Sequence, residues 1–499
     1  MKRILVLLFA AVLLSGAALA QRLVVGQGSD AVSLSPHNVN DQPSARVMRQ
    51  IYDTLIVQTE DLELVPGLAE SWEQLDDTTW RFNIRQGVTF HDGTPLTASD
   101  VAWTLNRLRD PATGAPAAFI VGFIDSLEAI DDYTVELKTN APFAPLLVHL
   151  SHTATSILSE AAVTAAGEDY GTTVVVGTGP FKFVRWDTAS QIVLERNDDW
   201  WGGEVLPAEV VFRPIIEGTV RAIELEAAGI DIAYALEPRD YLRLQDTPRV
   251  VVDEIETLST NYIGFNARKE PFDDVRVRQA INYALDVGAI IDAIYEGLGV
   301  PANGPISPQV FGANLELAGY DYDPERAKAL LAEAGYPNGF STTIWTNDNP
   351  LRIQIAEIVQ AFLADVGVSA EIQVLEWGAY LDGTANGNHD MFILGWVTVT
   401  ADADYGLYAL FHSSQFGAAG NRTFWSSERV DELLDLGRSE ADADSRMAFY
   451  AEAQEIIAEE APWIFLNVTL EFNGWRDNVS GFTPHPAGHH RLYNVSKAN

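Results

Sequence analysis

The chain has 499 residues, no cysteine, and 70 acidic against 32 basic side chains, which gives a formal net charge of −38. Such an acidic protein is a poor partner for nucleic acid, because phosphate binding needs clustered lysine and arginine, and anionic membrane surfaces repel it. The lack of cysteine excludes disulfides, and the length is too great for one compact core, so we expect two or more lobes.

Residues 1–20 have the pattern of a secretory signal peptide. Lys2 and Arg3 form a positive start, Ile4 to Leu14 form an apolar run, and Ala18-Leu19-Ala20 is a typical cleavage site. The run is short for a membrane span, so we expect cleavage after Ala20 in preference to an uncleaved anchor. A lipid anchor would require a cysteine at that site. We therefore expect an exported protein, not a lipoprotein, that is confined to the periplasm.

Strands and helices alternate through the first half of the chain. Arg22 to Val25, Thr79 to Ile84 and Tyr133 to Leu137 have the residue pattern of strands. Thr97 is placed to cap a helix, and Asp100 three residues later completes a capping box.

The second half has clearer boundaries. Helices are predicted to begin after Phe272-Asp273-Asp274 and at Asp323-Pro324, where aspartate caps the first turn. Ile353 to Val366 is an amphipathic helix, and strands are predicted at Val368 to Leu375 and at Met391 to Trp396. This alternation predicts α/β lobes with mixed sheets.

Two extended segments have the positions of connections between lobes. Thr260 to Asn266 lies between two half-chains of similar length, and we interpret it as one crossover strand. Trp463 to Val468 is a candidate for the return crossover. Two crossovers form a hinge, and a hinge between lobes produces a cleft that closes on a ligand.

The sequence lacks the common catalytic and nucleotide-binding motifs. Gly26-x-Gly28-x-x-Ala31 resembles a dinucleotide fingerprint, but Pro36 follows, so no helix begins there to receive a pyrophosphate. The sequence contains no phosphate-binding loop, nucleophile elbow, paired-histidine zinc motif or EF-hand loop. An enzyme is therefore the weaker class, and no cofactor is expected. A secreted hydrolase with paired carboxylates remains the alternative from that class.

Histidines raise the question of a metal site. His485, His489 and His490 lie near the C-terminus, and His149 and His152 lie three residues apart. A metal site needs convergent ligands and groups that orient them, and adjacent histidines point apart on a strand. We therefore predict a polar terminal strand at the C-terminal histidines and no metal.

Trp396 is the aromatic residue best placed to meet a ligand. It ends a predicted strand and is followed by a loop, Val397 to Tyr405. Loops at strand ends of α/β lobes commonly bind ligands, so we predict that Trp396 lines the site. Core packing is the alternative.

Six stretches of the sequence carry a resemblance to a known family. They are GLAESWEQLDDTTWRFNIRQGVTFHDGTPLTASDV (67–101), VGTGPFKFVRW (176–186), LERNDDWWGG (194–203), GFNARKEPFDDVRVRQAINYALD (264–286), YDPERAKALLAEAGYPNGF (322–340) and LYNVS (492–496). In this order and spacing they closely resemble the family 5 extracellular solute-binding proteins, which serve peptide, nickel and some sugar importers. His91 and Asp92 belong to the HDGTP turn, which we interpret as a structural Asx-type turn before a helix.

The resemblance implies an α/β fold like that of the large-cluster, type II periplasmic binding proteins, with two lobes about a hinge and an extra domain. Domain I is expected to comprise residues 21–50, 175–258 and 466–499, domain II residues 51–174, and domain III residues 259–465. The implied function is a monomeric, non-catalytic protein without membrane insertion. It would capture a small solute and deliver it to the permease and ATPase of an ABC importer.

The resemblance also bears on the ligand. Dipeptide and oligopeptide binders place an aspartate for the peptide's amino group three residues after a strand-end Gly-Trp, where this chain has Val399 after Gly395-Trp396. The arginine that dipeptide binders use for the carboxylate aligns with Thr346. Because unpaired buried charges are costly, capture of a simple dipeptide in that mode is disfavoured.

The stretches TIWTN (343–347), GWVTVTADADYGLYALF (395–411) and EAPWIFLNV (460–468) are instead similar to the glutathione-binding branch. We therefore expect a peptide-class ligand, either a short peptide or a glutathione-like solute, with a nickel chelate or an oligosaccharide as alternatives. Threonine hydroxyls would hydrogen-bond its carbonyls and carboxylates, and Asp402 would accept from an amino group or cap its own loop. The expected contacts are Ser29, Asp30, Trp345, Thr346, Asn347, Trp396, Thr398, Thr400 and Asp402.

Overall fold

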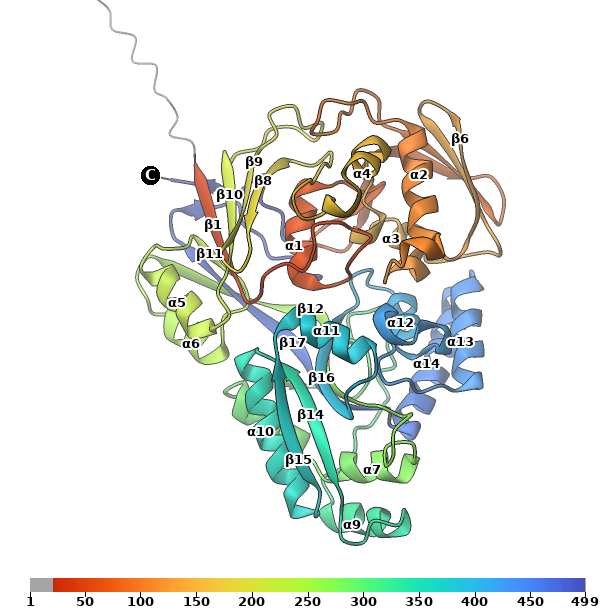
Figure 1. Cartoon of the computed structure of the whole chain (residues 1–499), viewed down its shortest axis with the longest axis vertical. Helices are drawn as coiled ribbons and strands as arrows, with labels where there is room; N and C mark the ends of the chain where they lie inside the picture. Colours follow the sequence, from red (N-terminus) through yellow and green to blue (C-terminus); the bar gives the residue numbers. More distant parts are fainter. Residues whose placement is uncertain (1–20, 499) are drawn as a thin grey trace, which may run out of the picture.

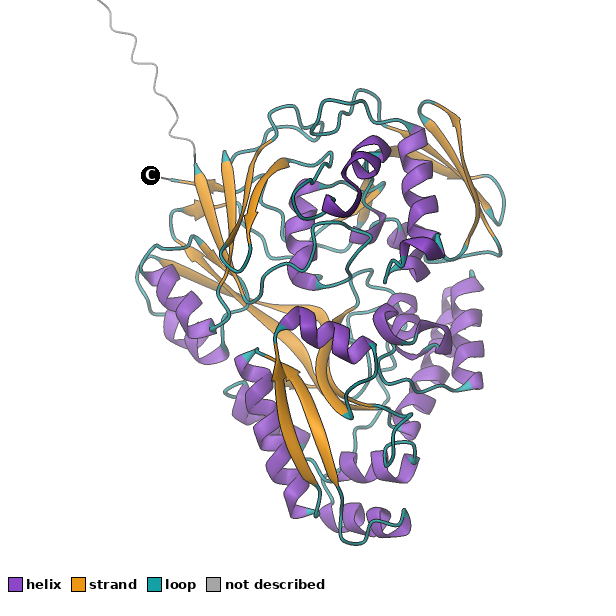
Figure 2. Cartoon of the chain, in the orientation of Figure 1, coloured by secondary structure: helices purple, strands orange, loops and turns teal. Residues whose placement is uncertain are grey.

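The computed structural model describes residues 21–498, and the expected signal peptide, residues 1–20, lies outside this range. In Figure 1 the N-terminal elements form an upper body and most of the later elements form a lower one, with two long strands running between them. The expected α/β class with two lobes and mixed sheets is confirmed, and Figure 2 shows helices flanking the strands in both bodies. Within the described range, every helix is too short or too polar to cross a membrane.

One sheet of 11 strands runs through both lobes, in the order β15-β14-β16-β12-β17-β11-β1-β10-β9-β8, with β13 beside β17. Its first-lobe strands are β1 (Arg22–Gln27), β8 (Phe181–Asp187), β9 (Gln191–Arg196), β10 (Glu209–Pro214) and β11 (Ile232–Ala233). Its second-lobe strands are β13 (Val300–Pro301), β14 (Ser341–Asn347), β15 (Ser369–Leu375) and β16 (Met391–Val397). The sheet is mixed, since β1 runs parallel to β10 and β14 runs parallel to β15, whereas β9 and β10 pair antiparallel.

The lobes are joined by β12 (Val250–Phe265) and β17 (Trp463–Arg476), which pair antiparallel along most of their length. Their register shifts between Glu256 and Thr260 and again between Asn261 and Tyr262. In the first lobe β17 pairs with β11, and in the second lobe β12 pairs with β16. The two segments predicted as crossovers, Thr260 to Asn266 and Trp463 to Val468, correspond to the second-lobe halves of these strands, and the prediction did not include their first-lobe halves.

Helices complete the two lobes. Those of the first lobe are α1 (Gln42–Ile51), α5 (Gly218–Glu226) and α6 (Pro238–Leu244). Those of the second lobe are α7 (Val275–Tyr283), α8 (Val287–Ile294), α9 (Pro324–Glu333), α10 (Pro350–Asp365), α11 (Trp377–Ala385), α12 (Ala409–Phe411), α13 (Glu428–Ser439) and α14 (Ala443–Glu460).

A third set of elements lies beside the first lobe (Figure 1). Its sheet has the order β4-β5-β7-β6, with β4 (Ala69–Gln74), β5 (Thr79–Ile84), β6 (Ile124–Asp131) and β7 (Thr134–Thr139). The remaining elements of this part are β2 (Ile56–Gln58), β3 (Leu64–Pro66), α2 (Ala98–Arg109), α3 (Leu146–His149) and α4 (Glu160–Ala166).

Local sequence signals account for several of these boundaries. The predicted capping box is present at the start of α2, where the Thr97 backbone N–H donates to Asp100 at 3.0 Å. Asp323 caps α9 and accepts from the Arg326 backbone N–H at 2.9 Å. The Asp92 carboxylate accepts from the backbone N–H of Thr94 at 3.0 Å, which confirms the structural turn predicted for the HDGTP motif.

The polar strand predicted at the C-terminal histidines is wrong. The segment is an irregular loop between β18 (Val479–Ser480) and β19 (Ser496–Lys497), and His485, His489 and His490 are all buried in it. The loop folds inward because its histidines find partners there: His490 Nε2 lies 2.9 Å from a Glu471 carboxylate oxygen. In residues 21–498 no three histidine and carboxylate side chains are grouped as metal ligands.

Stacked aromatic rings fix the second-lobe halves of the crossover strands to each other. Tyr262 of β12 and Trp463 of β17 stack with ring centroids 3.4 Å apart and planes within 6°. Phe411 also packs against Trp463, with ring centroids 4.6 Å apart, and all three rings are buried. The second-lobe halves of the crossover strands are therefore packed together within the core of that lobe.

We predict that Trp463→Ala lowers the free energy of unfolding by roughly 3–5 kcal/mol, because the lost indole leaves a cavity between the crossover strands. Urea denaturation followed by circular dichroism measures the change. Leu315→Ala is the control, since Leu315 is 68% exposed and its truncation should change stability by about 0.5 kcal/mol or less. Equal urea midpoints for the two variants would show that the Trp463 indole does not stabilise the packing of the crossover strands.

Candidate ligand-binding site

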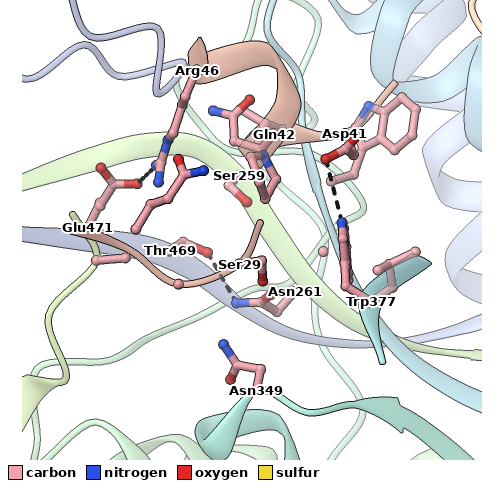
Figure 3. A pocket seen from close by; sticks show the side chains of 18 of the residues that line it. Ser29, Asp41, Gln42, Arg46, Ser259, Asn261, Asn349, Trp377, Thr469 and Glu471 are labelled. Atoms are coloured by element: carbon pink, nitrogen blue, oxygen red, sulfur yellow. Dashed lines mark hydrogen bonds and ion pairs between the residues drawn. The ribbon is translucent and has the colours of Figure 1, made fainter. Parts of the chain in front are cut away.

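A cavity of about 340 Å³ lies between the two lobes. This volume is at the lower end of the range found for small-molecule sites, which is roughly 300–1,000 Å³. First-lobe residues on its wall include Ser29, Asp41, Gln42, Arg46 and Glu471, and second-lobe residues include Ser259, Asn261, Asn349, Trp377 and Arg422. Figure 3 shows side chains from both lobes converging on this space.

Asp41 is placed at the cavity by the start of α1. As the N-cap residue, its Oδ1 accepts from the Ser44 backbone N–H at 3.1 Å. The same oxygen lies 3.5 Å from the indole N–H of Trp377, at the start of α11 in the opposite lobe (Figure 3). Oδ2 is buried without a hydrogen-bond partner among the described residues. Burial raises the pKa of Asp41, although the bonds from Ser44 and Trp377 oppose this shift.

Arg46 and Glu471 form a neutralised pair on the first-lobe side of the cavity. Their side chains make an ion pair, and His490 Nε2 lies 2.9 Å from the other Glu471 oxygen. Burial alone would raise the pKa of Glu471, but the Arg46 charge and the His490 contact hold it below its usual range. Burial lowers the pKa of His490. The pair therefore contributes polarity to the cavity but little net charge.

Two arginines on the second-lobe side have no such neutralising partner. Arg352, in the first turn of α10, donates from Nη1 to the Asn347 side-chain oxygen at 3.0 Å. Arg422 donates from Nε to the Thr384 hydroxyl at 3.2 Å. Neither makes an ion pair with any carboxylate of residues 21–498. Burial lowers the pKa of both guanidinium groups.

Three of the nine contacts predicted from sequence line the cavity: Ser29, Asn347 and Trp396. Trp396 is 9% exposed and packs on Tyr405, with ring centroids 5.2 Å apart. Its indole N–H is buried without a partner in the described part of the chain. The indole thus lines the cavity and also packs in the core, while its contact with a ligand stays a prediction.

The other six predicted contacts lie outside the cavity lining; they are Asp30, Trp345, Thr346, Thr398, Thr400 and Asp402. Asp30 accepts from the indole N–H of Trp186 at 3.1 Å. The three threonines are buried in the second lobe, and Trp345 packs beside His389. Asp402 pairs with Arg446 at 2.9 Å and accepts from the Asp404 backbone N–H at 3.0 Å, which confirms the alternative that it stabilises its own loop.

Sequence reasoning missed the charged residues of the cavity. In the sequence, Asp41 has only the pattern of a helix cap before Pro43. Arg352 has only the pattern of a residue in the first turn of an amphipathic helix. Arg422 lies in an irregular segment with no pattern of its own. Which of these side chains faces the cleft depends on how the lobes meet, and no local pattern carries that information.

Comparisons with known proteins agree with this geometry. The family model for bacterial extracellular solute-binding proteins, family 5, matches residues 63–418. The glutathione-binding protein GsiB of Pectobacterium atrosepticum is 31% identical over 93% of this chain and 91% of its own length. The dipeptide-binding protein of Escherichia coli is 32% identical over 87% of this chain and 86% of its own. A Helicobacter pylori periplasmic binding protein, DppA, in complex with the peptide STSA has a TM-score of 0.89 at 33% identity, covering 95% of this chain and 98% of its own.

A buried charge network next to the cavity ties the third set of elements to the second lobe. Asp404 begins a π-helix, Asp404–Tyr408, directly after the loop that follows Trp396. Its carboxylate pairs with Arg438 at 3.1 Å and with His149 of α3 at 3.0 Å, and Asp404 and His149 are fully buried. Burial would raise the pKa of Asp404, but the Arg438 charge and the His149 contact lower it from 3.8 to about 2.

This network predicts a specific sensitivity to acid. A carboxylate whose pKa falls on folding stabilises the protein above its unfolded pKa and loses that contribution as the pH drops through its folded pKa. Asp404→Asn should therefore be less stable than the parent near neutral pH, and the gap should shrink by roughly 2 kcal/mol between pH 5 and pH 2. Denaturation at a series of pH values measures the gap.

Asp198→Asn is the control for the acid prediction, because Asp198 is 76% exposed in its pair with Arg196. Exposed pairs contribute about 0–1 kcal/mol, so its gap should stay small at every pH. A gap for Asp404→Asn that is unchanged between pH 5 and pH 2 would show that the ionised carboxylate is not what stabilises the network.

Proposed function

Because the chain belongs to family 5 of the bacterial extracellular solute-binding proteins, we propose that it captures a short peptide outside the cytoplasm and delivers it to the permease and ATPase of an ABC importer. The observation that carries the proposal is the cavity of about 340 Å³ enclosed by residues of both lobes. Cleavage after Ala20 would release the protein, without a lipid, into the periplasm, where it acts as a monomer and binds rather than transforms its ligand.

The composition of the cavity wall supports a peptide-class ligand. Amide side chains of Asn261, Asn347 and Asn349 offer both donors and acceptors, as peptide groups require. Apolar area is provided by Trp377 and Trp396. A relative of known structure holds the peptide STSA, and another, from Pseudoalteromonas, holds Met-Leu at a TM-score of 0.91 and 26% identity. We propose that this chain accommodates a ligand of two or three residues.

Closure about the crossover strands provides the signal to the importer. A ligand that touches both lobes binds the closed form more tightly than the open form, so it shifts the population toward closure. The bend is proposed to occur near the register shift after Glu256, where β12 and β17 leave the first lobe. The permease then distinguishes loaded from empty protein by the distance between the lobes.

We predict that protein purified from the periplasm without unfolding carries a non-covalent ligand whose mass is that of a short peptide. Native mass spectrometry followed by fragmentation of the released ligand identifies it. Small-angle scattering before and after addition of the identified peptide should show a smaller radius of gyration in the loaded state. Release of an oligosaccharide or a nickel chelate would contradict the peptide class, and an unchanged radius at saturation would contradict closure.

Trp396→Ala should weaken binding of that peptide by more than tenfold, because truncation of a central aromatic anchor typically costs about 2 kcal/mol or more. It should also lower the melting temperature, since the same indole packs on Tyr405. Thr398→Val is the matched control, because Thr398 is buried beside the cavity but does not line it. Titration calorimetry and thermal unfolding on both variants separate the two effects. Equal affinities would place the ligand away from Trp396.

A further inference from the structure

The cavity has a surplus of positive charge within a strongly acidic protein. Seven ionised side chains line it, four arginines and three carboxylates, so their sum is +1, against −38 for the whole chain. The two lining histidines, His152 and His489, add nothing near neutral pH, because burial holds the pKa of each well below its usual range.

The surplus is located on the second-lobe side. Of the first-lobe arginines, Arg46 pairs with Glu471, and Arg221 donates to the carbonyls of Ile216 and Ala235. Arg352 and Arg422 have only neutral partners in the described chain: Arg352 bonds to the Asn347 side chain and lies 5.8 Å from the centre of the Trp377 ring, and Arg422 bonds to the Thr384 hydroxyl. Both arginines lie near the same two buried tyrosines, Tyr262 and Tyr380, where their charges oppose the effect of burial on the tyrosine pKa values.

A guanidinium group that has no carboxylate partner in the protein is stabilised by an anion from the ligand. Arg422 is only 8% exposed, so water replaces little of the hydration that it loses, and a buried charge without a counter-ion is strongly unfavourable. Guanidinium groups bind carboxylates with charge-assisted, often bidentate hydrogen bonds. The second-lobe wall is therefore built to receive carboxylate groups that the protein itself does not supply.

The first-lobe wall carries a carboxylate oxygen that lacks a hydrogen-bond donor in the described chain. Asp41 is 8% exposed, and its Oδ2 has no donor anywhere in residues 21–498. Oδ1 is already occupied by the cap of α1 and by Trp377. An ammonium group of the ligand would provide the missing donor and a compensating charge.

We propose that the cavity selects peptides carrying one ammonium and two carboxylates, with the ammonium at Asp41 and the carboxylates at Arg352 and Arg422. The proposal rests on the proposed function and specifies the charge of its ligand. These anchors occupy positions other than Val399 and Thr346, where the sequence lacks the charged residues of dipeptide binders. Acidic dipeptides and γ-glutamyl tripeptides share this chemistry.

The test compares two dipeptides of the same size by titration calorimetry, alanyl-glutamate and alanyl-glutamine, with glutathione as a third probe. The wild-type protein, freed of co-purified ligand by dialysis, should bind alanyl-glutamate roughly tenfold or more tightly than alanyl-glutamine. If glutathione binds more tightly than either dipeptide, the ligand is of the γ-glutamyl class. If it binds more weakly, the ligand is an α-linked acidic peptide. Equal affinities for the two dipeptides, or preference for the amide, would overturn the inference and leave the proposed function standing. Binding of none of the three probes by a protein that releases a non-peptide ligand would overturn the proposed function itself.

Variants of the cavity residues test which side chains cause the preference for alanyl-glutamate over alanyl-glutamine. Arg422→Gln and Arg352→Gln should each reduce the ratio of affinities for the acid and the amide, whereas Arg422→Lys, which keeps the charge, should retain most of it. Asp41→Asn should weaken both dipeptides by roughly tenfold without changing their ratio, because asparagine still caps α1 but loses the charge. Arg429→Gln controls for long-range charge, since Arg429 is exposed and lies outside the cavity lining. A ratio that none of the cavity variants changes would assign the selectivity to other groups and overturn the proposed anchors, and circular dichroism checks that each variant is folded.

Discussion

The pairing of β12 with β17 is the constraint on which the rest of the structure depends. These strands lie in the part of the 11-stranded sheet that runs through both lobes, so their pairing fixes how the two lobes are joined. The stacked rings of Tyr262 and Trp463 pack their second-lobe halves together, and we propose that the strands bend at the register shift between Glu256 and Thr260. Because the two lobes are joined in this way, the wall of the cavity consists of residues from both of them.

Charge is arranged in the molecule on two scales that act in opposite directions. At long range a net charge of −38 repels an acidic peptide, although salt screens exposed charges beyond about 8 Å at physiological ionic strength. Inside the cavity the charges of the lining side chains sum to +1; of the two arginines without a carboxylate partner, Arg422 is buried and Arg352 is partly exposed. Interactions between charges are much stronger there than at the surface. Recognition of charge therefore belongs to the closed cavity, whereas the acidic surface favours solubility.

The sequence allowed the fold to be predicted further than the site. Helix caps such as Asp323 and the capping box at Thr97 act within one turn, so their patterns are local and proved correct. The crossover strands were also predictable, since an extended segment between equal half-chains has few other roles. Trp396 was predicted at the cavity from its place near the end of a strand, and it does line the cavity. Asp41, Arg352 and Arg422 were not found, because they come from segments far apart in the sequence that only the tertiary fold brings to one cavity. The C-terminal histidines were misjudged because their burial comes from distant partners such as Glu471.

Asp41 links recognition of the ligand to closure of the lobes. Its Oδ1 reaches across the cavity to the Trp377 indole N–H, a contact that exists only while the lobes are together, and its Oδ2 is the atom left for a ligand ammonium. In the closed state without a cation, this carboxylate is buried with half of its hydrogen-bonding capacity unused, which burial penalises, as its raised pKa reflects. An ammonium removes that penalty only in the closed state. The free energy difference between open and closed forms thus depends on the charge of the ligand, so that the same side chain both selects the ligand and reports its presence.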